Sequence, residues 1–210
     1  MWHWIRLRHL STDSLPRPER RARLTLASLL VCGAMAASPI NAATTAPDPV
    51  LRELLREAMT DSDSFADPFD AQVWLTDMSL RLGDQVRDPE ERVTILKKVH
   101  AEASRVDLPP EMVLAVIDIE SAFDAYAVSV AGAQGLMQVM PFWLDEIGRP
   151  GDRLVDIQTN LRMGCTILRY YYDMEQGDWF RALGRYNGSL GRRKYPDKVM
   201  ERLRTRWFQQ

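Results

Sequence analysis

Apolar residues recur at helical spacing along most of the chain after residue 50. Apolar positions three and four residues apart mark one face of an amphipathic helix. No alternating pattern typical of β-strands reaches a useful length, so the sequence predicts an all-α fold. Three helical stripes come first: Leu51, Leu54, Leu55, Ala58 and Met59; then Ala71, Trp74, Leu75, Met78 and Leu82; then Val93, Leu96, Val99, Ala103 and Val106.

The run "DLPPEMVLAVIDIESAF" differs from these stripes because it is apolar on almost every face. Such a helix is a central one, covered by its neighbours, and Pro110 suits its first turn. Glu120 stands near its end, before "DAYAVSVAGAQG" breaks the helical pattern with two glycines. Burial against apolar neighbours would raise the pKa of this carboxyl, which suits a proton donor near neutral pH. A Glu at a helix end is more often a solvated surface residue, so this position alone does not define a site.

Composition places the chain among globular proteins, with 27% charged residues and a net charge of −2. Six arginines lie in the first 36 residues, before and at the edge of the apolar stretch "LTLASLLVCGAMAA". A helix needs about 20 apolar residues to span a bilayer, and this stretch is shorter. We therefore expect residues 1–36 to be a signal peptide and the protein to be periplasmic or exported to the cell envelope. A lipoprotein anchor at Cys32 is less favoured, because Val31 is larger than the usual residue before a lipidated cysteine.

Histidine and cysteine are too scarce in the exported chain to build a metal site. Two of the three histidines, His3 and His9, lie in the leader, and only Cys165 of the two cysteines would remain after export. Zinc and a Cys–His nucleophile are therefore not expected, and Cys165 in its helical setting is expected to be a buried, inert thiol. We expect no cofactor and an activity that EDTA does not affect.

Four elements occur in a fixed order after the central helix. They are Glu120-Ser121, the run "SVAGAQGLMQVMP" from Ser129 to Pro141, "NLRMG" from Asn160 to Gly164, and Tyr186-Asn187-Gly188. Together they resemble the soluble lytic transglycosylase (SLT) domain family over roughly residues 90 to 207. The resemblance implies a lysozyme-like α fold and cleavage of bacterial peptidoglycan, with glycan strands as the partner and no nucleic acid.

The resemblance assigns Glu120 as the only catalytic acid and base. This residue would protonate the oxygen between N-acetylmuramic acid and N-acetylglucosamine, then take a proton from the muramic acid 6-hydroxyl as a 1,6-anhydro ring closes. Ordinary glycosidases need a second carboxyl group as nucleophile or to activate water. Here the sugar supplies the nucleophile, so one carboxylate suffices.

The same resemblance assigns substrate contacts around this acid. Ser129 would contact an acetamido group, although a turn-capping hydroxyl explains it equally well. Gln138 and Met140 would line the cleft, and the Tyr186 hydroxyl would approach the catalytic carboxylate. Asn187 would contact sugar or shape its loop. Asn160 is expected to be structural, joining a helix start to the "GLMQ" loop. Arg185 is a departure that would depress the pKa of Glu120 if it faced the cleft, but an outward direction is favoured.

The expected organisation follows from these assignments. Residues 37–48 would be a tether, residues 49–88 an N-terminal helical segment, and residues 89–210 the catalytic domain of a monomer. Short isolated helices are marginal in water, so residues 49–88 should pack on the domain, on each other or on a cell-envelope machine. We expect docking on the domain, driven mainly by burial of Trp74, Leu75 and Met78. Attraction between acids at 61, 63, 67, 70 and 77 and the basic C-terminal run would add to it.

Two other classes of function stay open. A hydrolase on the same fold, like the goose-type lysozymes, would use water instead of the 6-hydroxyl and leave a reducing end. A non-catalytic wall-binding or secretion-assembly protein would keep the cleft without turnover. Intact Glu120 argues against the second. The sequence does not separate bulk wall recycling from a dedicated secretion or conjugation role, nor endo from exo cleavage.

Overall fold

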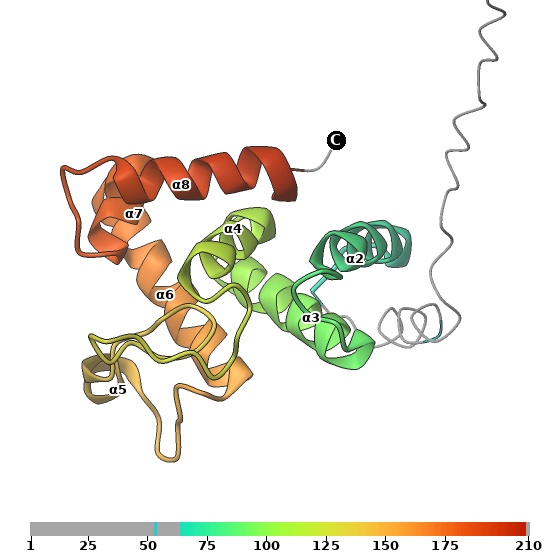
Figure 1. Cartoon of the computed structure of the whole chain (residues 1–210), viewed down its shortest axis with the longest axis horizontal. Helices are drawn as coiled ribbons and strands as arrows, with labels where there is room; N and C mark the ends of the chain where they lie inside the picture. The colour runs from blue at the N-terminus through green and yellow to red at the C-terminus, as the bar shows by residue number, and fades with distance from the viewer. Residues whose placement is uncertain (1–52, 54–63, 209–210) are drawn as a thin grey trace, which may run out of the picture. The chain divides into compact units, whose positions relative to one another are not determined.

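Helices and connecting loops make up the part of the chain that the structure, a computed structural model, describes: Glu53 and residues 64–208. These residues belong to one compact unit, Thr44–Gln210. The expected signal peptide, the tether and the stripe from Leu51 to Met59 lie outside the described residues. The helices are α2 (Pro68–Leu82), α3 (Pro89–Arg105), α4 (Pro110–Glu120), α5 (Phe142–Ile147), α6 (Ile157–Met174), α7 (Trp179–Tyr186), α8 (Lys194–Arg202) and the π-helix η1 (Leu203–Trp207) (Figure 1).

No β-strand forms in residues 64–208. Two isolated antiparallel bridges, from Gln134 to Val128 and to Val139, occur instead in the long loop between α4 and α5. The predicted all-α fold is therefore confirmed.

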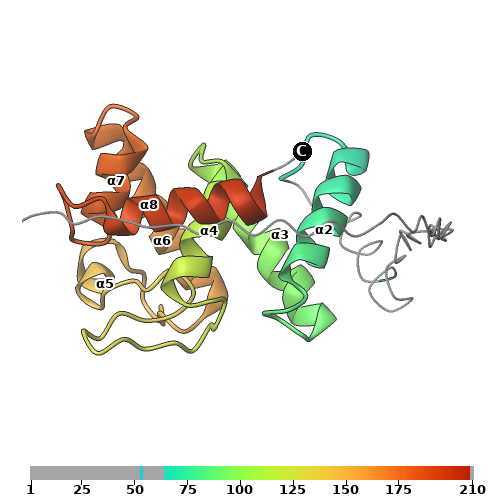
Figure 2. The same ribbon diagram turned by 45° about the horizontal axis from the view of Figure 1, so that its top comes forward.

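The central position predicted for α4 is confirmed as well. Every residue from Met112 to Asp118 is buried, and α3, α8 and η1 pack against the helix. In Figure 2, α8 runs across α4 and α7. The buried Asp118 fixes this arrangement, because its carboxylate accepts hydrogen bonds from Gln85 Nε2 (2.8 Å) and Trp207 Nε1 (3.0 Å) and lies 3.3 Å from Arg202 Nε. The helix that ends at Glu120 is thus held through Asp118 by polar contacts to distant segments.

Aspartate residues start four of these helices. In each case the carboxylate accepts a hydrogen bond from a backbone N–H of the first turn, which would otherwise lack a partner. Two of them stand in Asp-Pro pairs, where the proline lacks an N–H and has a backbone angle suited to the first helical position. The four are Asp67, Asp88, Asp156 and Asp178.

Helix α2 packs on the rest of the described chain through its apolar stripe. Trp74, Leu75 and Met78 are at most 4% exposed, and Trp74 Nε1 donates to Glu111 Oε1 at 2.7 Å. The basic C-terminal run meets α2 at a carbonyl: Arg206 Nη2 donates to the Arg81 oxygen at 2.6 Å, in the last turn, where helix carbonyls carry partial negative charge.

The acids of the N-terminal segment have local roles where the structure describes them. Asp77 pairs with Arg81 of its own helix, and Asp67 caps α2. These two acids therefore do not provide the expected attraction to the basic C-terminal run, because each has a partner within one turn of its own helix. Asp61 and Asp63 lie outside the described residues. The boundary at residue 88 stays a prediction.

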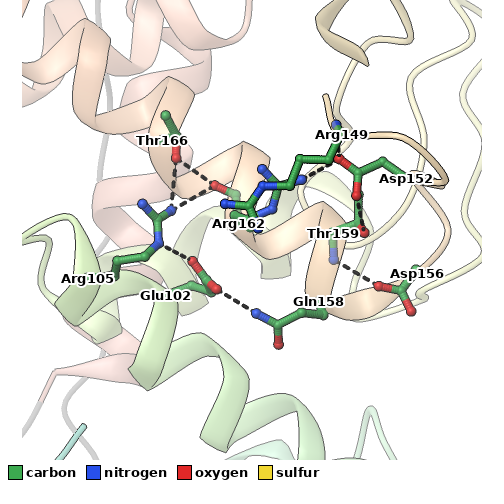
Figure 3. A network of polar contacts seen from close by, with 9 residues as sticks. All are labelled: Glu102, Arg105, Arg149, Asp152, Asp156, Gln158, Thr159, Arg162 and Thr166. Carbon is green, nitrogen blue, oxygen red and sulfur yellow. Dashed lines mark hydrogen bonds and ion pairs between the residues drawn. The ribbon is translucent and has the colours of Figure 1, made fainter. Parts of the chain in front are cut away.

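A polar network joins α3 to α6 and to the loop before it (Figure 3). Glu102 accepts from Arg105 Nε and from Gln158 Nε2, both at 2.5 Å. Arg105 also donates to Thr166 Oγ1 at 2.9 Å, and Arg162 pairs with Asp152. The network fixes α6, which in turn carries the residues that hold the long loop beside Glu120.

Candidate active site

Glu120 ends α4 at a strained turn. The next residues, Ala122 and Phe123, have φ angles of 50° and 68°, a region that residues with side chains rarely adopt. Phe123 is 3% exposed and its ring lies 5.4 Å from that of Trp207. Ser121 Oγ donates to the Leu136 carbonyl at 2.8 Å. Packing and hydrogen bonding therefore hold the chain in a conformation that directs Glu120 out of the helix end without exposing it fully.

Two effects act in opposite directions on the Glu120 carboxyl. Burial raises its pKa from 4.5 to about 7, because a charged carboxylate loses solvation there. Tyr195 Oη donates to Glu120 Oε1 at 2.6 Å and lowers the pKa, but burial is the larger effect. A carboxyl group with this pKa exchanges a proton readily near neutral pH, as a general acid that later acts as a base must do.

A cavity of about 360 Å³ opens beside this carboxyl group. Glu120 is the only carboxylate among the residues that line it. The start of α8 and the loop that precedes this helix form a second part of the cavity lining. The lining residues are Ile119, Glu120, Asn187, Ser189, Arg192, Lys194, Tyr195 and Lys198.

Met137 anchors the loop between α4 and α5 next to the site. Its N–H donates to Asn160 Oδ1 at 2.8 Å, and its carbonyl accepts from Tyr186 Oη at 2.7 Å. A Cβ at Gly164 would collide with the Met137 side chain, and one at Gly135 would collide with Asn160. The glycine, methionine and asparagine of the sequence motifs are thus partners in one packed contact.

Asn160 has the structural role expected from the sequence. Besides holding Met137, its Nδ2 donates to the carbonyls of Gln134 (2.8 Å) and Leu154 (2.7 Å). The side chain is 1% exposed and makes all three hydrogen bonds inside the protein. The Asn160 side chain therefore gives backbone groups of this loop the hydrogen bonds that a helix or a sheet would otherwise supply.

The predicted substrate residues fall into two groups. Glu120 and Asn187 line the same cavity, and Asn187 ends α7. Ser129, Gln138 and Met140 do not line it. Ser129 Oγ accepts from the Ala133 N–H at 3.0 Å, the turn-capping alternative, and Gln138 Nε2 donates to the Ala127 and Gly135 carbonyls. Both side chains are engaged with their own loop in the described structure.

The tyrosine that bonds the acid is not the one expected. Tyr186 Oη donates its hydrogen bond to the Met137 carbonyl. Burial and the charge of Glu120 both raise the pKa of the Tyr186 phenol, which indicates that this side chain lies near the acid without bonding it. Tyr195 makes the direct bond. It stands in the run "KYPDKVMERL", whose buried Tyr195 and Val199 are four residues apart, as on a core-facing helix stripe. In the sequence, this spacing is the one feature that points to Tyr195. It does not distinguish a tyrosine that packs in the core from one that donates a hydrogen bond to an acid.

Arg185 points away from the acid, as expected. It pairs with Glu175, which Arg181 also contacts. Cys165 is buried, as expected, and burial raises the pKa of its thiol, which disfavours the thiolate form. In the described part of the chain, no three His, Cys, Asp or Glu side chains gather in a way that could hold a metal ion. None of the described helices is long and apolar enough to cross a membrane.

Comparison with known proteins matches the same part of the chain. The family model of the transglycosylase SLT domain matches residues 98–207. A membrane-bound lytic murein transglycosylase C of Actinobacillus pleuropneumoniae is 48% identical over 46 residues, 22% of this chain and 13% of that protein. The soluble lytic murein transglycosylase of Escherichia coli K12 is 30% identical over 95 residues, 41% of this chain and 15% of that protein. The transglycosylase of Enterobacteria phage PRD1 is 30% identical over 112 residues, 50% of this chain and 41% of that protein.

Among solved structures, the lytic transglycosylase Slt of Pseudomonas aeruginosa, in its inactive E503Q form, matches with a TM-score of 0.43 and 21% identity. The match covers 74% of this chain and 34% of that one. The chain spans less than half the length of the curated relatives named above. The family model covers more than half of the chain itself, so this protein belongs to the transglycosylase SLT domain family.

Proposed function

We propose that this protein is a peptidoglycan lytic transglycosylase with Glu120 as its single acid and base. The observation that carries the proposal is a cavity with one carboxylate, held at a pKa of about 7 by burial. Glycosidases that use water or an enzyme nucleophile need a second carboxyl group, about 5–9.5 Å from the first. A cavity whose lining offers only one suits a reaction in which the substrate supplies the nucleophile.

The reaction has two proton transfers. Protonated Glu120 gives its proton to the oxygen between muramic acid C1 and N-acetylglucosamine as that C–O bond breaks. The 6-hydroxyl of the same muramic acid then bonds to C1, and its proton returns to Glu120. The products are an N-acetylglucosamine end and a 1,6-anhydromuramic acid end, with no water consumed. The muramic acid acetamido group can shield the positive charge that develops at C1.

Tyr195 supports both steps from one position. Its hydroxyl donates to the carboxylate and fixes one Glu120 oxygen, and it stabilises the ionised form that exists between the two transfers. Asn187 is placed to contact sugar in the cavity. Substrate contacts by Ser129, Gln138, Met140 and Tyr186 stay proposals, and the first two would need their present hydrogen bonds to change.

The setting of the reaction is part of the proposal. A leader at residues 1–36 and relatives named membrane-bound or soluble murein transglycosylases favour a periplasmic or cell-envelope location. We propose a monomeric catalytic domain at 89–210 and an N-terminal segment that a cell-envelope machine could also contact. The alternatives are a goose-type muramidase and a non-catalytic wall-binding protein.

Release of soluble muropeptides from purified sacculi tests the proposal. The exported chain, residues 37–210, should release them, and Glu120→Gln should lower the rate by at least about 10²-fold, as for loss of a general acid. A wild-type protein that folds and binds sacculi but releases nothing would favour the wall-binding alternative. A Glu120→Gln variant with nearly full activity would remove Glu120 from its assigned role.

A further inference from the structure

One wall of the cavity beside Glu120 carries three cations. Arg192 lies in the loop before α8, and Lys194 and Lys198 lie four residues apart on α8, which places them on the same face of that helix. Tyr195, which bonds Glu120, lies on the same side of α8. The three cationic side chains are therefore within the cavity that contains the catalytic acid.

These three cations differ from the neighbouring ones in having no ionic partner. Within the described residues, Arg192, Lys194 and Lys198 form no salt bridge. The basic residues on the other faces of the same segment are neutralised: Arg193 pairs with Asp197, Arg202 lies 3.3 Å from Asp118, and Arg204 pairs with Glu201. From Arg192 to Arg206, in the described part of the chain, the cations without an ionic partner are therefore the three that line the cavity.

The cations do not serve to keep Glu120 ionised. The two causes that act on the pKa of that carboxyl are burial and the Tyr195 hydrogen bond. A cation in contact with the carboxylate would lower its pKa and weaken the acid. In the described chain none of the three cations forms an ion pair with Glu120, so their charge is free to meet an anion brought by a ligand.

Neutral groups of the same wall also have no hydrogen-bond partner among residues 64–208. Ser189 Oγ is buried and makes no hydrogen bond to any residue of that range. A buried hydroxyl without a partner costs free energy, and such a group in a cavity commonly bonds a ligand or water. The exposed amide of Asn187 lies in the same cavity. A hydroxyl, an amide and three cations together match a ligand that combines hydrogen-bonding groups with negative charge.

We propose that Arg192, Lys194 and Lys198 form a subsite for the carboxylates that muramic acid carries on its lactyl group. This inference rests on the proposed function, because it places a muramic acid in the cavity. The carboxylates have two sources: those of the peptide attached to the lactyl group, or the lactyl carboxylate itself where the peptide is absent. Ammonium and guanidinium groups form strong, charge-assisted hydrogen bonds with both. The wall would thus select which muramic acid residues lie next to Glu120.

The test compares two substrates and two variants. The substrates are intact sacculi and the same glycan stripped of peptide by an amidase. The charge-removing variant is Lys194→Gln with Lys198→Gln. The control is Arg193→Gln, which removes the same kind of charge from the start of α8 but on a side chain that pairs with Asp197 and does not line the cavity. All these side chains are exposed, so both variants should keep the wild-type melting temperature.

The double variant should lose about tenfold or more in kcat/KM, mainly through KM, as expected for removal of charge-assisted contacts. The control should stay within about twofold. A greater loss on intact than on stripped glycan assigns the subsite to peptide carboxylates, and a greater loss on stripped glycan assigns it to the lactyl carboxylate. An equal loss on both supports a subsite that accepts carboxylates from either source. Wild-type activity should also fall with added salt, and the double variant should respond less. A double variant that matches the control on both substrates overturns the inference.

A binding measurement separates failure of this inference from failure of the proposed function. Glu120→Gln protein, with and without the double substitution, is titrated calorimetrically with a disaccharide–tetrapeptide and with the same disaccharide carrying a free lactyl carboxylate. Weaker binding of either ligand by at least about fivefold with the lysines replaced supports the subsite, and equal binding of both ligands overturns it. If the wild-type protein cleaves neither glycan, the proposed function fails, and the titration alone decides the inference.

Discussion

The Tyr195 hydroxyl donates a hydrogen bond of 2.6 Å to Oε1 of Glu120, although 75 residues separate the two along the chain. The bond joins α8 to the end of α4 and stabilises the charged carboxylate, while burial favours the protonated form. Because burial is the larger effect, the acid remains protonated up to neutral pH. Its oxygen nevertheless has a fixed partner. The pKa of Glu120 is thus lowered by a residue of α8, a helix near the far end of the chain.

Replacing Tyr195 by Phe should raise the pKa of Glu120 above about 7, because it removes the one interaction that lowers it. The basic limb of the kcat/KM–pH profile should move to higher pH. The rate at the optimum should fall by about 10–10²-fold, since the carboxylate loses its orientation and its partner between the two proton transfers. Tyr186→Phe is the control, because that hydroxyl bonds the Met137 carbonyl, and it should leave the basic limb in place. An unchanged limb in Tyr195→Phe would contradict this account of the acid.

Replacing Glu120 by Gln should stabilise the protein at pH 8. The folded-state pKa of about 7 lies above the ordinary value of 4.5, so the folded protein retains a proton between these values that the unfolded chain has lost. Stability of the wild type therefore falls as pH rises from about 4.5 to 7, while Gln does not titrate. Urea denaturation should show the variant about 1–3 kcal/mol more stable at pH 8 and the two proteins alike at pH 4. If the variant is less stable than the wild type at pH 8, burial of the ionised Glu120 carboxylate does not cost free energy, and this explanation of its pKa is wrong.

Replacing Asn160 by Ala should destabilise the loop between α4 and α5. The change leaves the Met137 N–H and the Leu154 carbonyl without the Asn160 partner, and it leaves the Gln134 carbonyl with the Val139 N–H as its donor. Each buried group left unpaired costs about 1–3 kcal/mol, so the melting temperature should drop by several degrees or more. Asn187→Ala, at an exposed position, should not change it. Equal melting temperatures for the two variants would remove the structural role of Asn160.

Replacing Trp74 by Ala should lower the free energy of unfolding by about 3–5 kcal/mol, because it leaves a cavity under α2 and removes the bond to Glu111. Phe69→Ala is the matched control on the same helix, since Phe69 is 69% exposed and should contribute little. Chemical denaturation should follow one transition in both variants if α2 and the SLT domain unfold together. A separate early transition for Trp74→Ala would indicate that α2 is an independent unit.

Short-range patterns allowed much of the fold to be predicted. The stripes of α2 and α3 and the all-round apolar run of α4 have their buried faces where periodicity places them. Four motif residues that carry the resemblance to the SLT family pack against one another: Gly135, Met137, Asn160 and Gly164. The two glycines lack a side chain, and Met137 and Asn160 occupy the space that this leaves.

The contacts that could not be predicted depend on how distant helices meet. Tyr195 reaches Glu120 only because α8 crosses α4, and no local pattern contains that crossing. Asp118 is similar: in the sequence it is a polar interruption of an apolar helix, but in the fold Gln85, Arg202 and Trp207 converge on it. The three cations of the cavity wall are ordinary surface residues in sequence. What distinguishes them in the fold is that they line one cavity with Glu120.

The mass of the released muropeptides distinguishes a lytic transglycosylase from a hydrolase. Purified sacculi are treated with residues 37–210, and the products are analysed by mass spectrometry before any reduction step. We expect glycan fragments that end in 1,6-anhydromuramic acid, lighter by one water than hydrolysis products and inert to borohydride, because the 6-hydroxyl closes on C1. Fragments with reducing muramic acid ends would contradict this expectation and assign the cavity to a hydrolase that activates water.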